Sequence, residues 1–289
     1  MAKIAWIQGK SQGSIAENIE YYKDKIACLK SSAEADNLEL VILPELFLTD
    51  YFAIEEKVDN FDLAFSKSSK ETMVFCELAR EHNLAIVFPF FERVSSALYF
   101  NSLYVIDSQG EINCHYRKMH IPDDPGFYEK YYFRPGDLGF KVAELGESLK
   151  LGTLICWDQW FPEAARITAL KGANLLIYPT AIGWDAGEPE DIYQDQLEAW
   201  LSVMRSHAIA NNVYVVAVNR VGKEGHLHFW GNSFCIDPYG KILHRDSTDE
   251  AISFIDLDFD RIEEARRVWP YFRDRRVDVY GDLQNLWMD

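Results

Sequence analysis

The stretch LKLGTLICWDQWFPEAAR, residues 149–166, indicates how this chain folds and where its chemistry lies. Its first part, Leu151 to Ile155, is a short apolar run, broken by one glycine, that is typical of a buried strand. From Pro162 onward the pattern favours a helix, because proline is tolerated in the first turn and an early glutamate suits the positive end of the helix dipole. Cys156 therefore lies where a buried strand ends and a helix is about to begin.

The thiol of Cys156 has two interpretations at this turn. Backbone N–H groups at a helix start, and nearby cations, lower a thiol pKa from about 8.5 toward neutrality, and the thiolate is the nucleophile. On this interpretation we expect a nucleophilic Cys156 with a lowered pKa. The alternative is a buried structural cysteine at a strand end, and this stretch leaves both open.

Composition limits the class of protein. The chain has 289 residues, of which 48% are hydrophobic and 26% charged, as in ordinary globular proteins. It contains no apolar run of 18 residues, so no membrane span is expected, and MAKIAWIQGK at its start is typical of a strand rather than a signal peptide. The net charge of −17 argues against nucleic acid as a partner.

Cysteine and histidine usage indicates neither disulfides nor a metal. The five cysteines are odd in number and widely spaced, without a CxxC pair, so we expect no disulfide, no structural zinc and a cytoplasmic location. The seven histidines are dispersed and form no HxxEH motif, so no metal or other cofactor is expected.

Hydrophobic periodicity predicts two similar halves, each with alternating strands and helices followed by a hairpin. Turns at 107–110 and 237–240 mark the two hairpins. The predicted strands are 3–7, 40–43, 84–91, 101–107, 111–116, 151–155, 175–178, 214–219, 252–257 and one leading into 237–240; the predicted helices begin near 15, 69, 162, 192 and 259. No linker divides the chain, so we expect one α/β domain over residues 1–289, with two sheets packed face to face and helices outside.

Two charged residues stand at the ends of other predicted strands. Glu45 follows Pro44 among leucines and a phenylalanine, and apolar surroundings raise the pKa of a glutamate, which makes it a candidate general base. The alternative is a capping or solvent-facing glutamate. Lys118 ends a hairpin strand and is a candidate cation for a developing oxyanion, or else a surface lysine.

Two loops hold further candidates. The long loop 123–140 is rich in aromatic residues, which argues for order, and it contains Glu129, whose simplest role is a surface ion pair with Lys130. A second loop, 180–191, has four acidic residues: Asp185, Glu188, Glu190 and Asp191.

Three motifs together resemble the nitrilase superfamily of carbon–nitrogen hydrolases: PELFLTDYF, YRKMHIP and LICWDQWFPEAARITALKGANLLIYPTAIGW. The likeness covers nearly the whole chain and implies a four-layer α-β-β-α sandwich. It implies that Cys156 is the nucleophile, Glu45 the general base, Lys118 the oxyanion stabiliser and Glu129 a supporting glutamate. The backbone N–H of Trp157 would complete the oxyanion hole.

The likeness also bears on the substrate. The nearest resemblance is to members that hydrolyse the ureido group of an N-carbamoyl diamine, and the next nearest is to members that act on N-carbamoyl β-amino acids. The stretches that carry it are KMHIPDDPGFYEKYYFRPGD, YPTAIGW and AVNRVGKEG. A diamine ends in an ammonium, so we expect a small cationic ureido substrate whose far end binds a carboxylate. The predicted substrate contacts are Asp185 and Glu188, with Asp158 in reserve, and Tyr51 and Trp157.

Other possibilities remain at this point. The stretch after Thr180 departs most from the family pattern, so the distal contacts are the least constrained. An amidase for plain ω-amides would share the chemistry, whereas a binding module on the same fold would need none of the catalytic residues. By the same likeness, helix 192–211 and the tail from about 266 to 289 are expected between subunits of a homodimer or larger oligomer; alternatively, the tail wraps its own domain.

Overall fold

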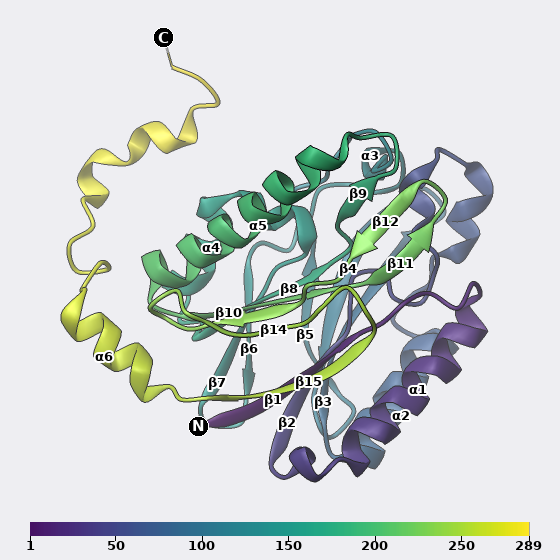
Figure 1. Ribbon diagram of the computed structural model, residues 1–289, viewed down its shortest axis with the longest axis horizontal. Coiled ribbons are helices and arrows are strands. Elements are labelled where there is room, and N and C mark those ends of the chain that lie inside the picture. Colours follow the sequence, from purple (N-terminus) through teal and green to yellow (C-terminus); the bar gives the residue numbers. More distant parts are fainter. Residues whose placement is uncertain (289) are drawn as a thin grey trace.

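The computed structural model describes residues 1–288 and contains two six-stranded mixed sheets. The first has the order β15-β1-β2-β3-β4-β5 and the second the order β14-β13-β10-β8-β7-β6 (Figure 1). The strands of the first sheet are β1 (Ala2–Gln8), β2 (Leu38–Ile42), β3 (Ala85–Ser95), β4 (Leu98–Ile106), β5 (Ile112–Arg117) and β15 (Ala251–Leu257). Those of the second are β6 (Lys141–Leu145), β7 (Leu149–Thr153), β8 (Leu175–Thr180), β10 (Tyr214–Asn219), β13 (Phe234–Ile236) and β14 (Ile242–Arg245).

Helices cover the outer face of each sheet, which gives four layers (Figure 1). Helices α1 (Ile15–Ser31) and α2 (Lys70–His82) pack on the first sheet, and α4 (Pro162–Leu170) and α5 (Glu190–Asn211) pack on the second. Ser14 caps α1 by accepting a hydrogen bond from the Glu17 backbone N–H, as its position before the apolar period predicts. The expected α-β-β-α sandwich is confirmed.

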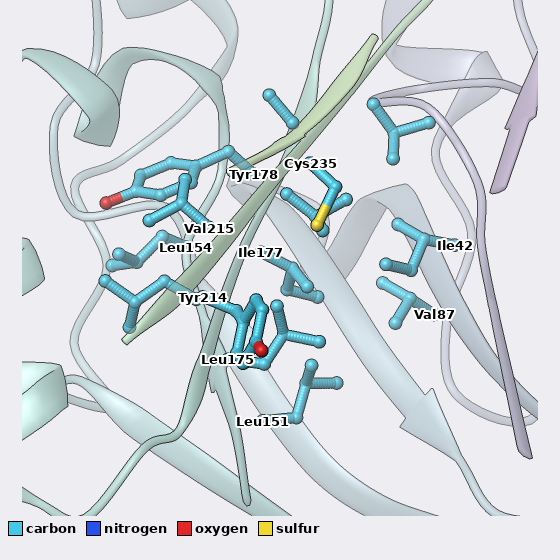
Figure 2. Packing of buried hydrophobic residues seen from close by; sticks show 14 of the residues in the cluster. Ile42, Val87, Leu151, Leu154, Leu175, Ile177, Tyr178, Tyr214, Val215 and Cys235 are labelled. Carbon is cyan, nitrogen blue, oxygen red and sulfur yellow. The ribbon is translucent and has the colours of Figure 1, made fainter. Parts of the chain in front are cut away.

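Alternation along the strands explains why the sheets are covered on both sides. In β1, Ile4 and Trp6 face the layer between the sheets, whereas Ala5 and Ile7 pack under α1 and α2. Figure 2 shows the layer between the sheets, where Ile42 and Val87 meet residues of the second sheet such as Ile177. Strands buried on both faces are typical of parallel pairs such as β1–β2 and β7–β8.

Four local predictions were wrong. Strand β6, an antiparallel edge strand beside β7, was not expected, and β8 continues through Pro179 rather than ending there. The acidic loop contains β9 (Gly183–Asp185), which joins β11 (Val221–Glu224) and β12 (Leu227–Trp230) in a small third sheet. The loop 123–140 contains a single helical turn, α3 (Glu129–Tyr132).

The tail that follows α6 (Asp260–Val268) runs away from the sheets (Figure 1). It carries exposed apolar side chains, listed here in chain order: Val277, Val279, Leu283, Leu286, Trp287 and Met288. Its position between subunits stays a prediction. Within residues 1–288, no helix is long and apolar enough to cross a bilayer.

Candidate active site

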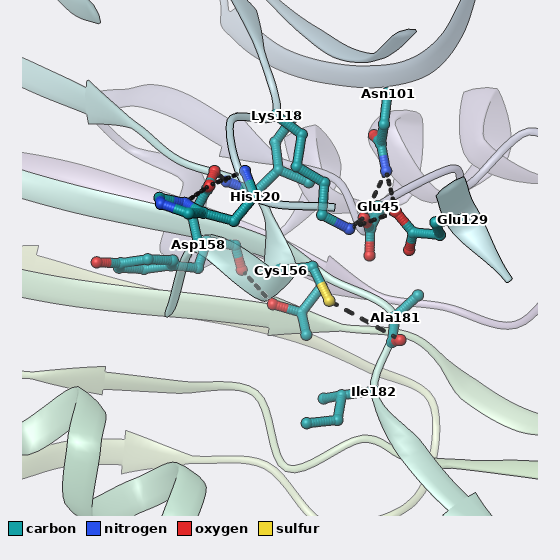
Figure 3. A network of polar contacts seen from close by, with 12 residues as sticks. Glu45, Asn101, Lys118, His120, Glu129, Cys156, Asp158, Ala181 and Ile182 are labelled. Atoms are coloured by element: carbon teal, nitrogen blue, oxygen red, sulfur yellow. Dashed lines mark hydrogen bonds and ion pairs between the residues drawn. The ribbon is translucent and has the colours of Figure 1, made fainter. Parts of the chain in front are cut away.

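The three predicted catalytic residues follow strands whose carboxyl ends meet at one edge of the sandwich. In the first sheet β2 runs parallel to β3, and β4 runs antiparallel to both β3 and β5, so β2 and β5 point the same way. Glu45 lies three residues beyond β2, and Lys118 directly follows β5. Cys156 lies three residues beyond β7 of the second sheet. Figure 3 shows the three side chains together.

Lys118 forms two buried ion pairs. Its Nζ lies 2.8 Å from Glu45 Oε1 and 2.7 Å from Glu129 Oε2, and all three side chains are at most 1% exposed. Glu129, at the start of α3, therefore pairs with Lys118 instead of Lys130. Such close packing of one ammonium and two carboxylates requires hydrogen bonds to the remaining oxygens, since unpaired buried charge is costly.

Only one of the remaining oxygens, Glu129 Oε1, receives such a hydrogen bond. Asn101 reinforces the two oxygens that Lys118 already binds, and Glu45 Oε2 has no hydrogen-bond partner among the described residues. Asn101, in the middle of β4, donates from Nδ2 to Glu45 Oε1 at 2.7 Å and to Glu129 Oε2 at 3.4 Å. Tyr51 donates from its hydroxyl to Glu129 Oε1 at 2.8 Å. Tyr51 was expected to contact substrate, but it is fully buried behind Glu129. Asn101 was missed; its only signal is an amide inside a mostly apolar strand.

Cys156 occupies a strained turn. Its φ of 39° lies in the left-handed region, which is rare for a residue other than glycine. The residues that follow form a 3₁₀ turn, Cys156–Trp160, and α4 begins only at Pro162. The Sγ atom lies 4.0 Å from the Ala181 carbonyl oxygen, toward which the thiol can donate. The helix start that was expected to activate the thiol is therefore one turn further along the chain.

The electrostatics of the site overturn the expected thiol pKa. Burial raises the pKa of Cys156 well above its usual value, Glu45 and Glu129 raise it further, and Lys118 opposes them. Burial and the like charge of Glu129 raise the pKa of Glu45, although Lys118 and the thiol partly offset this rise. Burial disfavours the ammonium of Lys118, but Glu129 and Glu45 more than compensate and raise its pKa. The thiol is therefore protonated at rest, beside a carboxylate of increased basicity.

Asp158 does not reach the cavity. The side chain is completely buried, and both oxygens accept hydrogen bonds from the protein: Oδ2 from the Tyr116 hydroxyl and the Ile155 N–H, and Oδ1 from the His120 N–H and ring Nδ1. Its reserve role as a substrate contact does not fit this position, because four protein donors occupy its lone pairs and it does not line the cavity.

A cavity of about 650 Å³ opens beside Cys156 and Glu129. Trp157 lines it, and its role as a substrate contact stays a prediction. Besides Glu129, three acidic residues line it: Asp124, Asp185 and Glu188. Asp185 faces His226 Nε2 at 3.6 Å, and Glu188 accepts two hydrogen bonds from Gln196 Nε2 at 3.0 and 3.1 Å. Among the described lining residues there is no lysine or arginine.

A larger hollow, of about 1040 Å³, lies on the other side of Tyr51. It extends from the start of α1 to β11, and neither Cys156 nor Glu129, which line the first cavity, lines it. Size therefore does not identify the reaction site, and the grouping of the charged residues does. Among the side chains that the structure describes, no group of three or more histidines, cysteines, aspartates or glutamates is suited to a metal.

Residues 3–267 match the family described as carbon-nitrogen hydrolase. The chain belongs to that family, and it is an amidohydrolase by class. A solved carbon-nitrogen hydrolase from Helicobacter pylori G27 superposes with a TM-score of 0.95 at 40% sequence identity, covering 99% of both chains.

Two curated relatives are similar to this chain over most of its length. The N-carbamoylputrescine amidase of Arabidopsis thaliana is 42% identical over 268 residues, which are 89% of this chain and 88% of the relative. The citrullinase of Francisella tularensis is 39% identical over 287 residues, or 97% of each chain. Both names specify compounds with a terminal ureido group, and they differ in what stands at the far end.

Proposed function

We propose that this chain hydrolyses N-carbamoylputrescine to putrescine, carbon dioxide and ammonia, a step of polyamine biosynthesis. The observation that carries the proposal is one cavity with Cys156 and Glu129 at its inner end and carboxylates at its outer wall. The inner end suits attack on a ureido carbon. The outer wall suits a primary ammonium, and its described residues offer no cation to a carboxylate.

In the first half of the reaction, Cys156 Sγ attacks the ureido carbon as its proton moves to Glu45. A ureido carbon is a poor electrophile because two nitrogens donate into its carbonyl, so attack needs a base and a counter-charge. The carbon–nitrogen bond to the terminal NH₂ then breaks, Glu45 returns the proton, and ammonia leaves. The product is a thioester-type intermediate on Cys156. Positioned proton transfer of this kind contributes about 10²–10⁴ in rate.

In the second half, Glu45 takes a proton from water, and the hydroxide equivalent attacks the same carbon. The carbon–sulfur bond breaks, and the proton restores the Cys156 thiol. The released carbamic acid decomposes to carbon dioxide and putrescine, so the whole reaction consumes one water. Glu45 is the base in both halves. Its pKa must therefore be raised, and its carboxylate must still be ionised when each half begins.

The developing oxyanion binds the Lys118 ammonium and the Trp157 backbone N–H in this proposal. Lys118 is held charged by Glu45 and Glu129, so it supplies a fixed positive charge without reorganisation. Losing one such donor costs about 3–4 kcal/mol in the transition state. Glu129 orients Lys118 through their ion pair, and Tyr51 holds Glu129 through its hydroxyl.

The far end of the substrate distinguishes the candidates. Putrescine ends in an ammonium, which Asp185, Glu188 and the exposed Asp124 attract. The second candidate is a ureido α-amino acid, favoured by the citrullinase relative. Its carboxylate would have to meet neutral donors, since the described wall is acidic. N-carbamoyl-β-alanine and plain ω-amides are further alternatives with the same chemistry.

Ammonia release from a panel of N-carbamoylputrescine, citrulline, N-carbamoyl-β-alanine and an ω-amide tests the proposal. We expect the highest kcat/KM for N-carbamoylputrescine, and no turnover by the Cys156→Ala variant on any of them. The variant should still fold and bind. Faster turnover of an acid than of the diamine would refute the substrate, and turnover near wild type by Cys156→Ala would refute the nucleophile.

A further inference from the structure

Asp158 has a contact pattern that the proposed reaction leaves unexplained. A carboxylate has about four lone-pair sites, and this one is surrounded by four donors: Tyr116 Oη at 2.7 Å, Ile155 N at 3.0 Å, His120 N at 3.1 Å and His120 Nδ1 at 2.7 Å. The side chain is 0% exposed. Because the carboxylate accepts there, the hydrogen of the imidazole is on Nδ1.

The donors come from both sheets of the sandwich. Tyr116 and His120 lie on either side of Lys118 in the chain, at the end of β5 in the first sheet. Ile155 directly precedes Cys156, which follows β7 in the second sheet. Asp158 therefore connects the backbone around the ammonium to the backbone around the thiol. Figure 3 shows this carboxylate and His120 on the side of Cys156 away from Glu129.

The turn that holds Cys156 needs such support. A left-handed φ at a residue with a side chain costs energy and persists only where the surroundings enforce it. His120 is itself held, since its ring stacks on Phe161 with centroids 3.7 Å apart and planes 7° apart. Phe161 follows the 3₁₀ turn that begins at Cys156, so the connection returns to the same turn.

We infer that Asp158, together with His120, is a positioning pair that sets the distance and orientation between the Cys156 thiol and the Lys118 ammonium. It touches no substrate and takes no proton. The inference rests on the proposed function, in which Cys156 attacks the carbon of one ureido group and Lys118 binds the oxygen of the same group. A displacement of about 1 Å between reacting groups lowers the rate by about 10²-fold, which is the size of effect expected here.

Asp158→Asn tests the inference most directly. The amide has one accepting oxygen, so in either orientation its NH₂ group faces a backbone N–H, of Ile155 or of His120, that cannot accept. We expect kcat for ureido hydrolysis to fall by about 10²-fold with KM changed by less than about threefold, because the cavity wall is untouched. Mass spectrometry should show slower alkylation of Cys156 by iodoacetamide.

His120 variants keep the test decisive if Asp158→Asn does not fold. His120→Leu removes the ring donor and should lower kcat by about tenfold, whereas His120→Asn places an amide N–H near the position of Nδ1 and should restore most of it. The matched control is Asp246→Asn. Asp246 is also a buried aspartate bonded to a histidine, His244, and it accepts from Trp6 and Ser253 far from Cys156.

The outcomes separate the inference from the proposed function. If Asp158→Asn or His120→Leu lowers stability as Asp246→Asn does but leaves kcat of the folded enzyme unchanged, the pair is structural and the inference is wrong. Faster alkylation of the buried Cys156 would also contradict the inference, since it would show that the turn around Cys156 has loosened. If instead the Cys156→Ala variant turns over substrate, the proposed function fails, whatever the Asp158 variants do.

Discussion

Replacing Glu129 by glutamine removes one negative charge from the site while keeping its shape. The carboxylate oxygens of Glu45 and Glu129 lie 2.8 and 2.7 Å from Lys118 Nζ, so they are at most the sum of these distances, about 5.5 Å, apart. At an effective dielectric constant of about 20, two unit charges at that separation repel by about 3 kcal/mol, which corresponds to about two pKa units. The amide oxygen of glutamine can accept from Lys118 while its NH₂ group donates to the Tyr51 hydroxyl, which accepts as well as donates.

The sign of the expected change follows from the causes of the Glu45 pKa. Burial raises it and Glu129 raises it further, whereas Lys118 lowers it. Removing Glu129 takes away the like charge and leaves Lys118 to Glu45 alone, so the Glu45 pKa falls. The acid limb of kcat/KM against pH should therefore move down by about two units. The plateau should fall as well, because a weaker base accepts the Cys156 proton less readily.

The assay is ammonia release from N-carbamoylputrescine over a pH series, with wild type, Glu129→Gln and a matched control. Glu250→Gln is that control, because Glu250 also binds a tyrosine hydroxyl, from Tyr21, and a lysine, Lys25, but at a surface site. Its acid limb should coincide with wild type. An acid limb that stays in place, or moves to higher pH, in Glu129→Gln would refute the assignment of Glu45 as the titrating base.

Three other outcomes follow from the same geometry. Lys118→Met leaves two buried carboxylates face to face, so the free energy of unfolding measured in urea should fall by about 3–5 kcal/mol. Turnover should fall at least about 10²-fold, and a stable, active variant would contradict the oxyanion role. Burial alone would raise the pKa of Glu92, but hydrogen bonds from Arg117 and His115 lower it to about 2. The ionised Glu92 therefore stabilises the fold above about pH 4.3, and this contribution is lost as the pH falls toward about 2. In Glu92→Gln the measured free energy of unfolding should depend less on pH across that window. A chain ending at Val268 should keep its circular dichroism but show a lower mass by light scattering if the apolar tail joins subunits, and an unchanged oligomer would place the tail elsewhere.

Residues that follow apolar runs were the ones that the sequence could locate. Glu45, Lys118 and Cys156 each come just after a strand whose hydrophobic pattern is clear. The first two follow strands of one sheet, and Cys156 follows a strand of the second sheet, which packs against the first. Glu129 was predicted by likeness alone, since a glutamate beside a lysine in a loop has a simpler interpretation. Glu129 pairs with Lys118 because the tertiary fold places α3 beside the end of β5, which the local sequence does not show.

Other features depend on tertiary contacts that no local pattern contains. Asn101 faces the carboxylates because of the register of β4 with β5, where Ser102 is opposite Arg117. Asp158 stands next to the catalytic turn in sequence and suggested a substrate contact, but the 3₁₀ turn directs it into the protein. Strands β9, β11 and β12 are three or four residues long, too short for a period to be recognised.

The raised thiol pKa changes what the site must do. A preformed thiolate would need a cation beside it that is not already neutralised, yet Lys118 is shared between two carboxylates. The cluster of Glu45, Glu129 and Lys118 carries a net negative charge when all three are ionised, and that charge disfavours a second anion on Cys156. The thiol must then lose its proton to Glu45 as it attacks, when the charge passes to an oxygen next to Lys118. Nucleophile, base and ammonium thus have to be correctly spaced at the same moment, which is why a fixed connection between the Cys156 and Lys118 segments matters for rate more than for binding.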